Sequence, residues 1–423
     1  MSIEVLSFGC RLNGAEAETM RSRAAAAGLS DLVIVNSCAV TVEAGRQVRQ
    51  AIRRAARLRP EAIVVVGGCG AQVETSAYAA MPEVAALLGN AEKMEPAIWS
   101  RLAQGRLGRV EIGGLAGARR LESAASDAGA GRVRVFVEIQ NGCDHSCTFC
   151  TIPAGRGRSR SVPAEAVTGT VRAAVAGGAR EVVLTGVDIT AYGRDLGAGA
   201  TLGRLVKAIL AEVPELPRLR LSSIDSVEAD DDLFDAMAGE ARLMAHLHLS
   251  LQAGDDLVLK RMKRRHSHAD AVRFCEEMRR ARPGIVFGAD LIAGFPTESE
   301  AMFRRSLDLV ESCGLTHLHV FPYSPRPGTP AARMPAVPRE EVRERAARLR
   351  RAGEEALSRH LAGEVGRVRE VLVEGSGLAR TEGFAMVWLA RPAPKGALGP
   401  AFVTGRTEGA LLAEFMPETA PAG

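Results

Sequence analysis

The sequence predicts an α/β fold class in three parts: an N-terminal parallel-sheet α/β domain, a central partial (β/α)6 barrel, and a small C-terminal all-β barrel of OB-like kind. Three observations predict it. Short apolar runs alternate with helical patterns over the first hundred residues, this alternation resumes on a larger scale after a Gly-, Ala- and Ser-rich segment, and the chain ends in apolar runs separated by Gly and Pro. The domain boundaries we expect are 1–112, 132–362 and 363–421, with a linker at 113–131.

Length and composition are those of an ordinary globular protein. The 423 residues suffice for two to four domains of roughly 100 to 200 residues. No run of about 18 apolar residues is present, so we expect no membrane span. The N-terminus does not match a signal peptide, and we therefore expect a cytoplasmic protein, which we take to be a monomer. Eight cysteines in that compartment favour metal binding or redox chemistry over disulfides.

The first domain is predicted from apolar runs that are continuous rather than alternating. Strands are expected at Ile3–Phe8, Leu32–Val35 and Ile63–Val66, with helices near Ala15–Ala27 and Glu43–Leu58. Continuous apolar strands separated by helices are typical of a parallel sheet with right-handed crossovers.

The central domain repeats a strand and helix pattern six times. The strands are expected at Val133–Gln140, Glu181–Val187, Arg218–Ser223, His246–Leu251, Ile285–Ala293 and His317–Tyr323. The clearest helical patterns are at Ala164–Ala176, Ala269–Arg282, Glu300–Cys313 and Arg339–Leu361. Such units predict a barrel or partial barrel whose functional groups lie where the strands end.

The last domain is predicted to be a small antiparallel barrel from four apolar runs, at Val368–Val373, Phe384–Leu389, Ala401–Val403 and Ala410–Phe415. Small barrels of this kind often bind single-stranded nucleic acid. From Gly366 onward, six basic residues balance six acidic ones, so an RNA-binding role rests on shape and not on charge.

Three cysteines follow the first barrel strand with the spacing C-x3-C-x2-C: Cys143, Cys147 and Cys150, here called the barrel triad. Structural zinc normally has four closed ligands, and the nearest further cysteine is Cys69, 74 residues away. A 4Fe-4S cluster held by three thiolates leaves one iron open for another ligand. A zinc site completed by His145, or reduced core cysteines, remain the alternatives.

Three more cysteines, Cys10, Cys38 and Cys69, each follow a predicted parallel strand and are here called the N-terminal triad. Parallel strands end at one edge of their sheet, so cysteines far apart in sequence can converge there. This arrangement suggests a second three-thiolate cluster, with three unrelated buried cysteines as the alternative.

The barrel triad, with Phe149 before its last cysteine, resembles the signature of the radical S-adenosylmethionine enzymes. Further blocks resemble, in order, those of the radical S-adenosylmethionine methylthiotransferase family. They are SFGCRLN, VNSCAVT, GGCGAQ, CDHSCTFCTIP with GRGRSRS, LTGVDI, LSLQAGDD, GADLIAGFPTE and VFPYSPRPGT. The C-terminal barrel resembles a TRAM domain, so the resemblance covers nearly the whole chain.

The resemblance implies two 4Fe-4S clusters and S-adenosylmethionine as cofactors. The barrel triad would hold the cluster that cleaves S-adenosylmethionine to a radical, and the N-terminal triad an auxiliary cluster that carries or supplies sulfur. The net reaction replaces C-H with C-SCH3, while the protein binds and shields the cofactors. It also implies a reductant of flavodoxin or ferredoxin type and a sulfur donor as partners.

Branches of this family differ in substrate. One modifies threonylcarbamoyl-adenosine in tRNA, one isopentenyl-adenosine in tRNA, and one an aspartate of a ribosomal protein. Here GCRLN, VNSCAVT and TIPAGRGRSRS most resemble the first branch, which implies modification at C2 of an adenosine beside the anticodon. A base in a loop can be splayed into a pocket more cheaply than one in a duplex. Asp188, Ala253 and the ARTEGF segment near Thr381 depart from the family pattern.

Further site candidates follow from their positions. Gly186, Ser250 and Gln252 lie at predicted strand ends and could line the S-adenosylmethionine pocket, with strand packing as the alternative. The candidates for contact with the tRNA anticodon loop are Arg156, Arg158 and Arg160 after the barrel triad, and Arg46, Arg49 and Arg53 on one helix face. A solvated helix face is the alternative for the latter group. A rival function is a metal-stabilised RNA-binding module without turnover.

Overall fold

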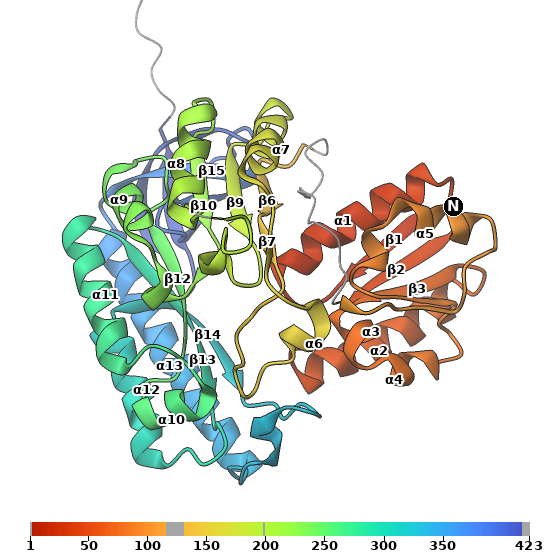
Figure 1. The fold of residues 1–423 in the computed structure, drawn as a ribbon. Coiled ribbons are helices and arrows are strands. Elements are labelled where there is room, and N and C mark those ends of the chain that lie inside the picture. Colours follow the sequence, from red (N-terminus) through yellow and green to blue (C-terminus); the bar gives the residue numbers. More distant parts are fainter. Residues whose placement is uncertain (1, 116–130, 198, 417–423) are drawn as a thin grey trace, which may run out of the picture.

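The computed structural model describes residues 2–115, 131–197 and 199–416 (Figure 1). The part of the chain predicted as a linker lies mostly outside these residues. Within the described ranges, no helix is long and apolar enough to cross a membrane.

The N-terminal domain is a five-stranded parallel sheet in the order β1-β2-β3-β4-β5. Its strands are β1 Ile3–Ser7, β2 Leu32–Ser37, β3 Ile63–Gly68, β4 Ala86–Leu88 and β5 Val110–Glu111. Its helices are α1 Arg11–Ala26, α2 Val42–Leu58, α3 Cys69–Val73, α4 Thr75–Ala79 and α5 Pro96–Ala103. All of β2 is buried, which explains why its sequence is a continuous apolar run.

Different helices cover the two faces of this sheet. Met20 of α1 and Trp99 of α5 share a hydrophobic cluster with Ile34, whereas Ile52 of α2 clusters with Val33 on the opposite face. Because β1, β2 and β3 follow one another across the sheet, the crossovers through α1 and α2 have opposite hands. The expectation that every crossover is right-handed is therefore wrong for one of them. Helix α1 also packs against the first strand of the central domain, and this contact holds the helix on its face of the N-terminal sheet (Figure 1).

The central domain is an open barrel of parallel strands with helices outside. The sheets run β6-β9-β10 and β11-β12-β13-β14, and Ser222 separates β10 from β11. The strands are β6 Arg134–Glu138, β9 Glu181–Thr185, β10 Arg218–Leu221, β11 Ser223–Ile224, β12 His246–Gln252, β13 Val286–Ala293 and β14 Leu315–Pro322. The helices are α6 Ile152–Arg156, α7 Ala164–Ala176, α8 Leu202–Glu212, α9 Asp231–Gly239, α10 Asp256–Met262, α11 His268–Ala281, α12 Glu300–Ser312 and α13 Arg339–Glu364.

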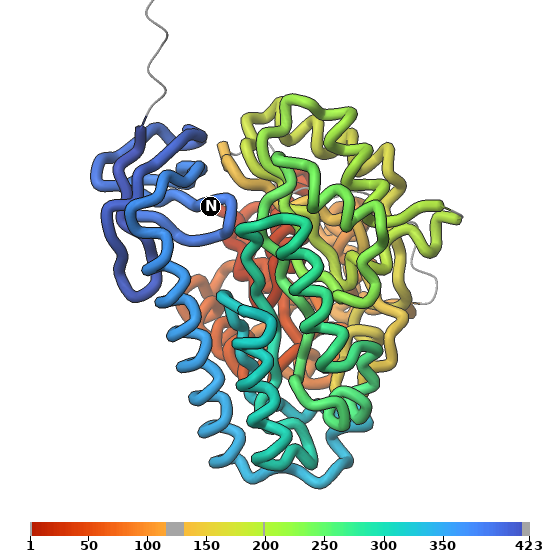
Figure 2. Tube along the Cα trace, turned by 90° about the vertical axis from the view of Figure 1, so that its left-hand side faces the viewer, coloured from red at the N-terminus to blue at the C-terminus, as the bar shows by residue number. Residues whose placement is uncertain are grey.

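Helix α13 leads into the C-terminal barrel, as Figure 2 shows. The barrel is closed in the order β15-β16-β17-β19-β18. Its strands are β15 Val368–Gly375, β16 Leu378–Thr381, β17 Met386–Leu389, β18 Leu398–Arg406 and β19 Leu411–Phe415. The sequence analysis missed β16, and it expected an antiparallel barrel although β17 and β19 pair in parallel.

The C-terminal barrel docks at the amino ends of the central strands. Arg218 of β10 donates to the main-chain oxygens of Glu370 and Arg380, at 2.8 and 3.1 Å. Phe384 stacks on His246 at the start of β12, with ring centroids 4.7 Å apart. One end of the central barrel is thus covered, and the carboxyl ends of its strands remain for a functional site.

Candidate active site

A cavity of about 360 Å³ lies between the N-terminal sheet and the carboxyl ends of the central strands. All six cysteines of the N-terminal and barrel triads line it. The structure therefore brings together two groups of thiols that come from different domains.

The N-terminal triad sits where β1, β2 and β3 end. Cys10 immediately precedes α1, Cys38 follows β2, and Cys69 is the first residue of α3. The backbone N-H of Val40 donates to the Cys38 sulfur at 3.4 Å. Burial raises the pKa of Cys38 to about 11, because a thiolate is poorly solvated there. Thiolates at this edge therefore need a metal centre or a positive charge to stabilise them.

The barrel triad lies in a loop whose ends are paired. Gln140 of β7 (Gln140–Asn141) pairs with Ser161 of β8 (Arg160–Ser161), so the short strands close the loop. Main-chain N-H groups point at two of the sulfurs, with His145 N 3.4 Å from Cys143 Sγ and Ile152 N 3.4 Å from Cys150 Sγ. Such hydrogen bonds stabilise cluster thiolates.

The spacing of the sulfurs decides between one metal ion and a larger cluster. Among the described residues, two groups have three possible ligand atoms within 4.8 Å of one another: Cys143–His145–Asp188 and His248–Asp290–His319. Neither thiol triad is so compact. Tetrahedral zinc with Zn–S bonds of about 2.3 Å would hold thiolates roughly 3.8 Å apart. Neither triad therefore has, in this structure, the compact spacing that a single zinc ion requires.

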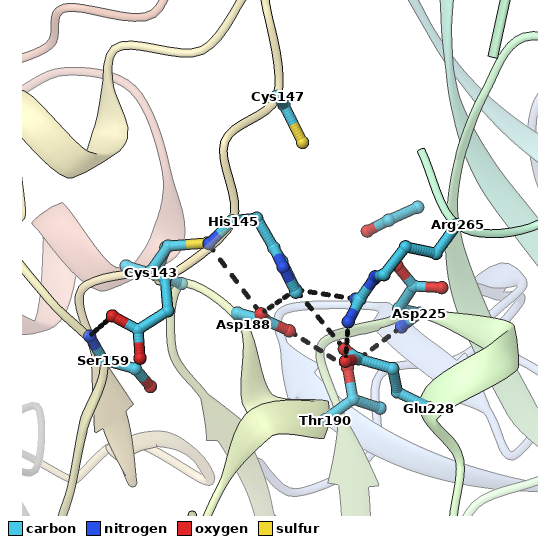
Figure 3. Close-up of polar contacts among 12 residues, drawn as sticks. Cys143, His145, Cys147, Ser159, Asp188, Thr190, Asp225, Glu228 and Arg265 are labelled. Carbon is cyan, nitrogen blue, oxygen red and sulfur yellow. Dashed lines mark hydrogen bonds and ion pairs between the residues drawn. The ribbon is translucent and has the colours of Figure 1, made fainter. Parts of the chain in front are cut away.

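His145 is engaged by carboxylates (Figure 3). Its Nε2 lies 2.8 Å from Asp188 Oδ2 and 3.4 Å from Glu228 Oε2. Hydrogen bonds that His145 donates to Asp188 and then to Glu228 raise the pKa of His145 to about 9, so the imidazole is protonated near neutral pH. The imidazole must lose this proton before it can bind a metal ion, so the two carboxylates weaken His145 as a zinc ligand.

The three residues predicted to contact S-adenosylmethionine all line the cavity. A Cβ atom on Gly186 would lie 2.6 Å from the main-chain oxygen of Gln140, so only glycine fits there. Gln252 ends β12 with φ at 70°, an uncommon conformation for a residue with a side chain. The main-chain oxygen of Ser250 accepts a hydrogen bond from Arg264. Their assignment to the cofactor stays a prediction.

Arg156 is placed differently from our expectation. Its side chain is 1% exposed, and its Nε lies 3.1 Å from Cys69 Sγ. Its other nitrogens donate to Glu16 Oε1 at 2.7 Å and Asn13 Oδ1 at 2.6 Å. The prediction that Arg156 contacts RNA is therefore wrong, because the protein encloses the whole guanidinium group.

The surroundings of Arg156 are charged and buried. Lys93 Nζ lies 2.6 Å from Glu16 Oε2, and both side chains are buried. Arg156 and Lys93 hold the pKa of Glu16 at about 2 despite its burial, and the charges around Arg156 raise its own pKa well above the usual range. Three ionised groups thus lie beside the N-terminal triad.

The other predicted RNA contacts lie nearer the surface. Arg158 has a side chain that is 88% exposed and pairs with Asp144 at 3.2 Å, and Arg160 is half-buried. On α2, the three arginines approach Glu43, Glu74 and Glu83 respectively: Arg46 at 2.7 Å, Arg49 at 3.3 Å and Arg53 at 4.0 Å. Their contact with RNA stays a prediction.

Arg264 is a site residue that the sequence analysis missed. It belongs to the run KRMKRR, a pattern that by itself predicts an RNA contact or a surface charge run. Its side chain is instead buried, with Nη1 3.7 Å from Cys147 Sγ and Nη2 2.7 Å from Asp225 Oδ2. No local signal distinguishes Arg264 from its neighbours in the run.

Two family models match the chain. Residues 137–310 match the Radical SAM superfamily, and residues 2–89 match Uncharacterized protein family UPF0004. These matches cover the two domains that supply the cysteines.

Similar proteins extend the comparison to nearly the whole chain. "Threonylcarbamoyladenosine tRNA methylthiotransferase MtaB" of Rickettsia prowazekii is 43% identical over 406 residues, covering 96% of each chain. The chain belongs to the radical S-adenosylmethionine methylthiotransferase family. The MtaB protein of Thermotoga maritima is 34% identical, covering 88% of this methylthiotransferase and 86% of its own length. "tRNA-2-methylthio-N(6)-dimethylallyladenosine synthase" of Erythrobacter litoralis is also 34% identical, with the same shares covered. Membership implies an enzyme that uses S-adenosylmethionine and a 4Fe-4S cluster.

Solved structures share the fold of this methylthiotransferase at low identity. The radical S-adenosylmethionine methyltransferase TsrM from Kitasatospora setae matches with a TM-score of 0.52 and 18% identity, over 76% of this chain and 68% of that one. The cobalamin-dependent S-adenosylmethionine radical enzyme OxsB matches with a TM-score of 0.53 and 10% identity, over 84% and 56%. Both support the open barrel architecture.

Proposed function

We propose that this methylthiotransferase acts on tRNA and converts C2-H to C2-SCH3 in a threonylcarbamoyl-adenosine beside the anticodon. The observation that carries the proposal is the single cavity lined by both cysteine triads. Sulfur insertion at an unactivated carbon needs a sulfur source within reach of the place where that carbon is made reactive. The two cysteine triads face the same cavity and so meet this requirement. A module that only binds RNA would not need such an arrangement.

The cysteines divide into two roles. The barrel triad would hold the cluster at which S-adenosylmethionine binds, and the N-terminal triad would hold an auxiliary 4Fe-4S cluster. When bound, the first cluster supplies the electron that cleaves S-adenosylmethionine, and the second supplies the sulfur. Turnover would also require a reductant of flavodoxin or ferredoxin type and a sulfur donor.

The protein's own residues would bind and orient the cofactors and shield them from water. Gly186, Ser250 and Gln252 form part of the cavity wall, and the absence of a side chain at Gly186 makes room for the main-chain oxygen of Gln140. Phe149 packs edge-on against Phe295 at 6.5 Å beside the barrel triad, which helps exclude water from it. A dry site keeps a reactive intermediate from side reactions.

The choice of nucleoside rests on the relatives. The Rickettsia prowazekii protein named for threonylcarbamoyladenosine is 43% identical, whereas the Erythrobacter litoralis and Anaeromyxobacter proteins named for dimethylallyladenosine are 34% and 35% identical. The greater identity, over a larger share of the chain, favours the threonylcarbamoyl substrate.

The test is a product assay with defined substrates. Anaerobically reconstituted enzyme with S-adenosylmethionine and reductant is given two tRNAs that lack the methylthio group, one carrying threonylcarbamoyl-adenosine and one carrying isopentenyl-adenosine. Nucleoside mass spectrometry is expected to show the methylthio group on the first alone. The matched control is the Cys143→Ala/Cys147→Ala/Cys150→Ala variant, which should leave both tRNAs unchanged.

Other outcomes identify the alternatives. Modification of the isopentenyl substrate, or of a ribosomal-protein aspartate, would retain the chemistry and change the substrate. Protein that holds zinc and never cleaves S-adenosylmethionine after reduction would instead establish the RNA-binding module.

A further inference from the structure

We propose that Arg156 is the positioning residue of the auxiliary site, and that its buried charge raises the reduction potential of a cluster held by the N-terminal triad. The inference rests on the proposed function, since it requires a cluster on Cys10, Cys38 and Cys69. It goes beyond that function because it assigns a role to a side chain from the other domain.

The contacts of Arg156 fix its guanidinium in one orientation. Nε faces Cys69 Sγ at 3.1 Å, Nη1 faces Glu16 Oε1 at 2.7 Å and Asn141 Oδ1 at 3.0 Å, and Nη2 faces Asn13 Oδ1 at 2.6 Å. A planar group with five donors is held rigidly when its contacts lie on several sides. The sulfur of Cys69 therefore has a fixed, charged hydrogen-bond donor.

Arg156 supplies buried positive charge beside the N-terminal triad. An oxidised 4Fe-4S core with two positive charges, held by three thiolates, carries one net negative charge. Arg156 and Lys93 add two positive charges against the negative charge of Glu16, and the carboxyl of Glu138 also lies near these groups. An uncompensated charge in a protein interior is costly, and the added electron of the reduced state makes the site more negative. Arg156 stabilises that state, which means a higher reduction potential.

The barrel triad lies in a different electrostatic environment. Its nearby arginine, Arg264, lies 3.7 Å from Cys147 Sγ and donates to Asp225 at 2.7 Å, so it is farther from its sulfur than Arg156 is from Cys69 Sγ, at 3.1 Å. Arg156 also follows Cys150 by only six residues, at the end of α6. The short segment from Cys150 to Arg156 therefore carries one cysteine of the barrel triad and also the positive charge that lies beside the N-terminal triad.

The experiment isolates the auxiliary site. The parent protein is the full chain with Cys143→Ala/Cys147→Ala/Cys150→Ala, reconstituted anaerobically, so that only the N-terminal triad can hold iron. Arg156→Gln, Arg156→Lys and the exposed control Arg158→Gln are made in it. Iron content is measured first, and the midpoint potential is then determined by a redox titration followed by electron paramagnetic resonance.

Arg156→Gln is expected to lower the potential by at least the equivalent of a tenfold change in the reduction equilibrium, about 59 mV for one electron. Arg158→Gln should match the parent, and Arg156→Lys should lie much nearer to the parent than Arg156→Gln does. If Arg156→Gln loses its iron, retention of iron by Arg156→Lys supports the role of charge.

An unchanged potential in Arg156→Gln would overturn the inference. Equal effects of Arg156→Lys and Arg156→Gln, on the potential or on iron content, would also overturn it, because shape rather than charge would then matter. A parent protein that binds no cluster would instead refute the two-cluster function, and the inference would fail with it.

Discussion

Gly9 lies so close to Cys38 that a Cβ atom on Gly9 would be 2.6 Å from the Cys38 sulfur. Gly9 also has φ at +91°, where residues with side chains are strained. Gly9→Ala must therefore displace Cys38 or the loop between β1 and α1. We expect it to lose most of the iron bound by the N-terminal triad and about 1–3 kcal/mol of stability. Iron analysis and thermal unfolding measure both effects.

Gly14→Ala is the matched control, since Gly14 lies inside α1 and a Cβ atom there would meet no neighbour within 4 Å. Alanine favours a helix interior over glycine by about 1 kcal/mol. This variant should keep its iron and gain slightly in stability. Equal loss of iron in both variants would contradict the account of Gly9.

The two triads should bind iron independently. Wild-type protein is expected to hold about eight irons after anaerobic reconstitution, since each three-thiolate 4Fe-4S cluster contributes about four. Cys10→Ala/Cys38→Ala/Cys69→Ala and Cys143→Ala/Cys147→Ala/Cys150→Ala should each retain about half of that iron. Iron and sulfide analysis is the measurement. About four irons in the wild type, lost only with the barrel triad, would contradict a second cluster.

Long apolar runs predicted the fold well, and short strands escaped prediction. The pattern of β2 and β3 follows from the burial of every residue in them except Ile63, which demands an apolar residue at nearly every position. Strands β4, β5 and β16 have two to four residues each, too few to show a period. The opposite hands of the first two crossovers could not be predicted because α1 is positioned by contacts with another domain.

The convergence of the N-terminal triad could be predicted from sequence because each of its cysteines follows a parallel strand, and the ends of parallel strands converge. The burial of Arg156 and Arg264 could not be predicted from the sequence. Glu16 lies 140 residues before Arg156, and Asp225 lies 39 residues before Arg264. An arginine in a basic run gives no sign of a distant carboxylate, so the long-range fold alone decides which arginines are enclosed.

Glu138 should make stability depend on pH. It is buried, and burial, with the nearby charge of Glu16, raises its pKa from 4.5 to about 7. The folded chain therefore binds this proton more tightly than the unfolded chain does. Its stabilising contribution is fully present below pH 4.5 and is lost as the pH rises to about 7.

Glu138→Gln removes this titration and keeps an oxygen to accept the hydrogen bond from Asn141 Nδ2, which is 2.6 Å away in the wild type. The variant should become relatively more stable than wild type as the pH rises, by roughly 1–3 kcal/mol at pH 7. Urea unfolding of the cluster-free wild-type and variant proteins between pH 4.5 and about 7 measures this difference in stability. Parallel stability curves for the two proteins would contradict the assignment.

Phe384 should hold the C-terminal barrel against the central barrel. It stacks on His246 at 4.7 Å, and the guanidinium of Arg380 lies 4.5 Å from its ring centroid. Phe384→Ala removes these contacts, and we expect a loss of about 2–4 kcal/mol and faster proteolysis of the C-terminal barrel. Trp388→Ala is the control, because Trp388 is 45% exposed and should change stability by less than about 0.5 kcal/mol. Similar effects of both changes would argue against docking through Phe384.

The exposed arginines of α2 provide a test of tRNA binding now that Arg156 is excluded. The side chains of Arg46 and Arg53 are 64% and 57% exposed, so phosphates can reach them. Each phosphate contact releases counterions, and Arg46→Ala/Arg53→Ala should weaken tRNA binding and reduce the salt slope by about two. Fluorescence anisotropy over a series of salt concentrations measures the slope. Arg280→Ala is the control, since Arg280 is 72% exposed on α11, far from α2 (Figure 1). An unchanged slope in the double variant would mean that this helix face is only solvated, because an RNA contact cannot be lost without changing counterion release.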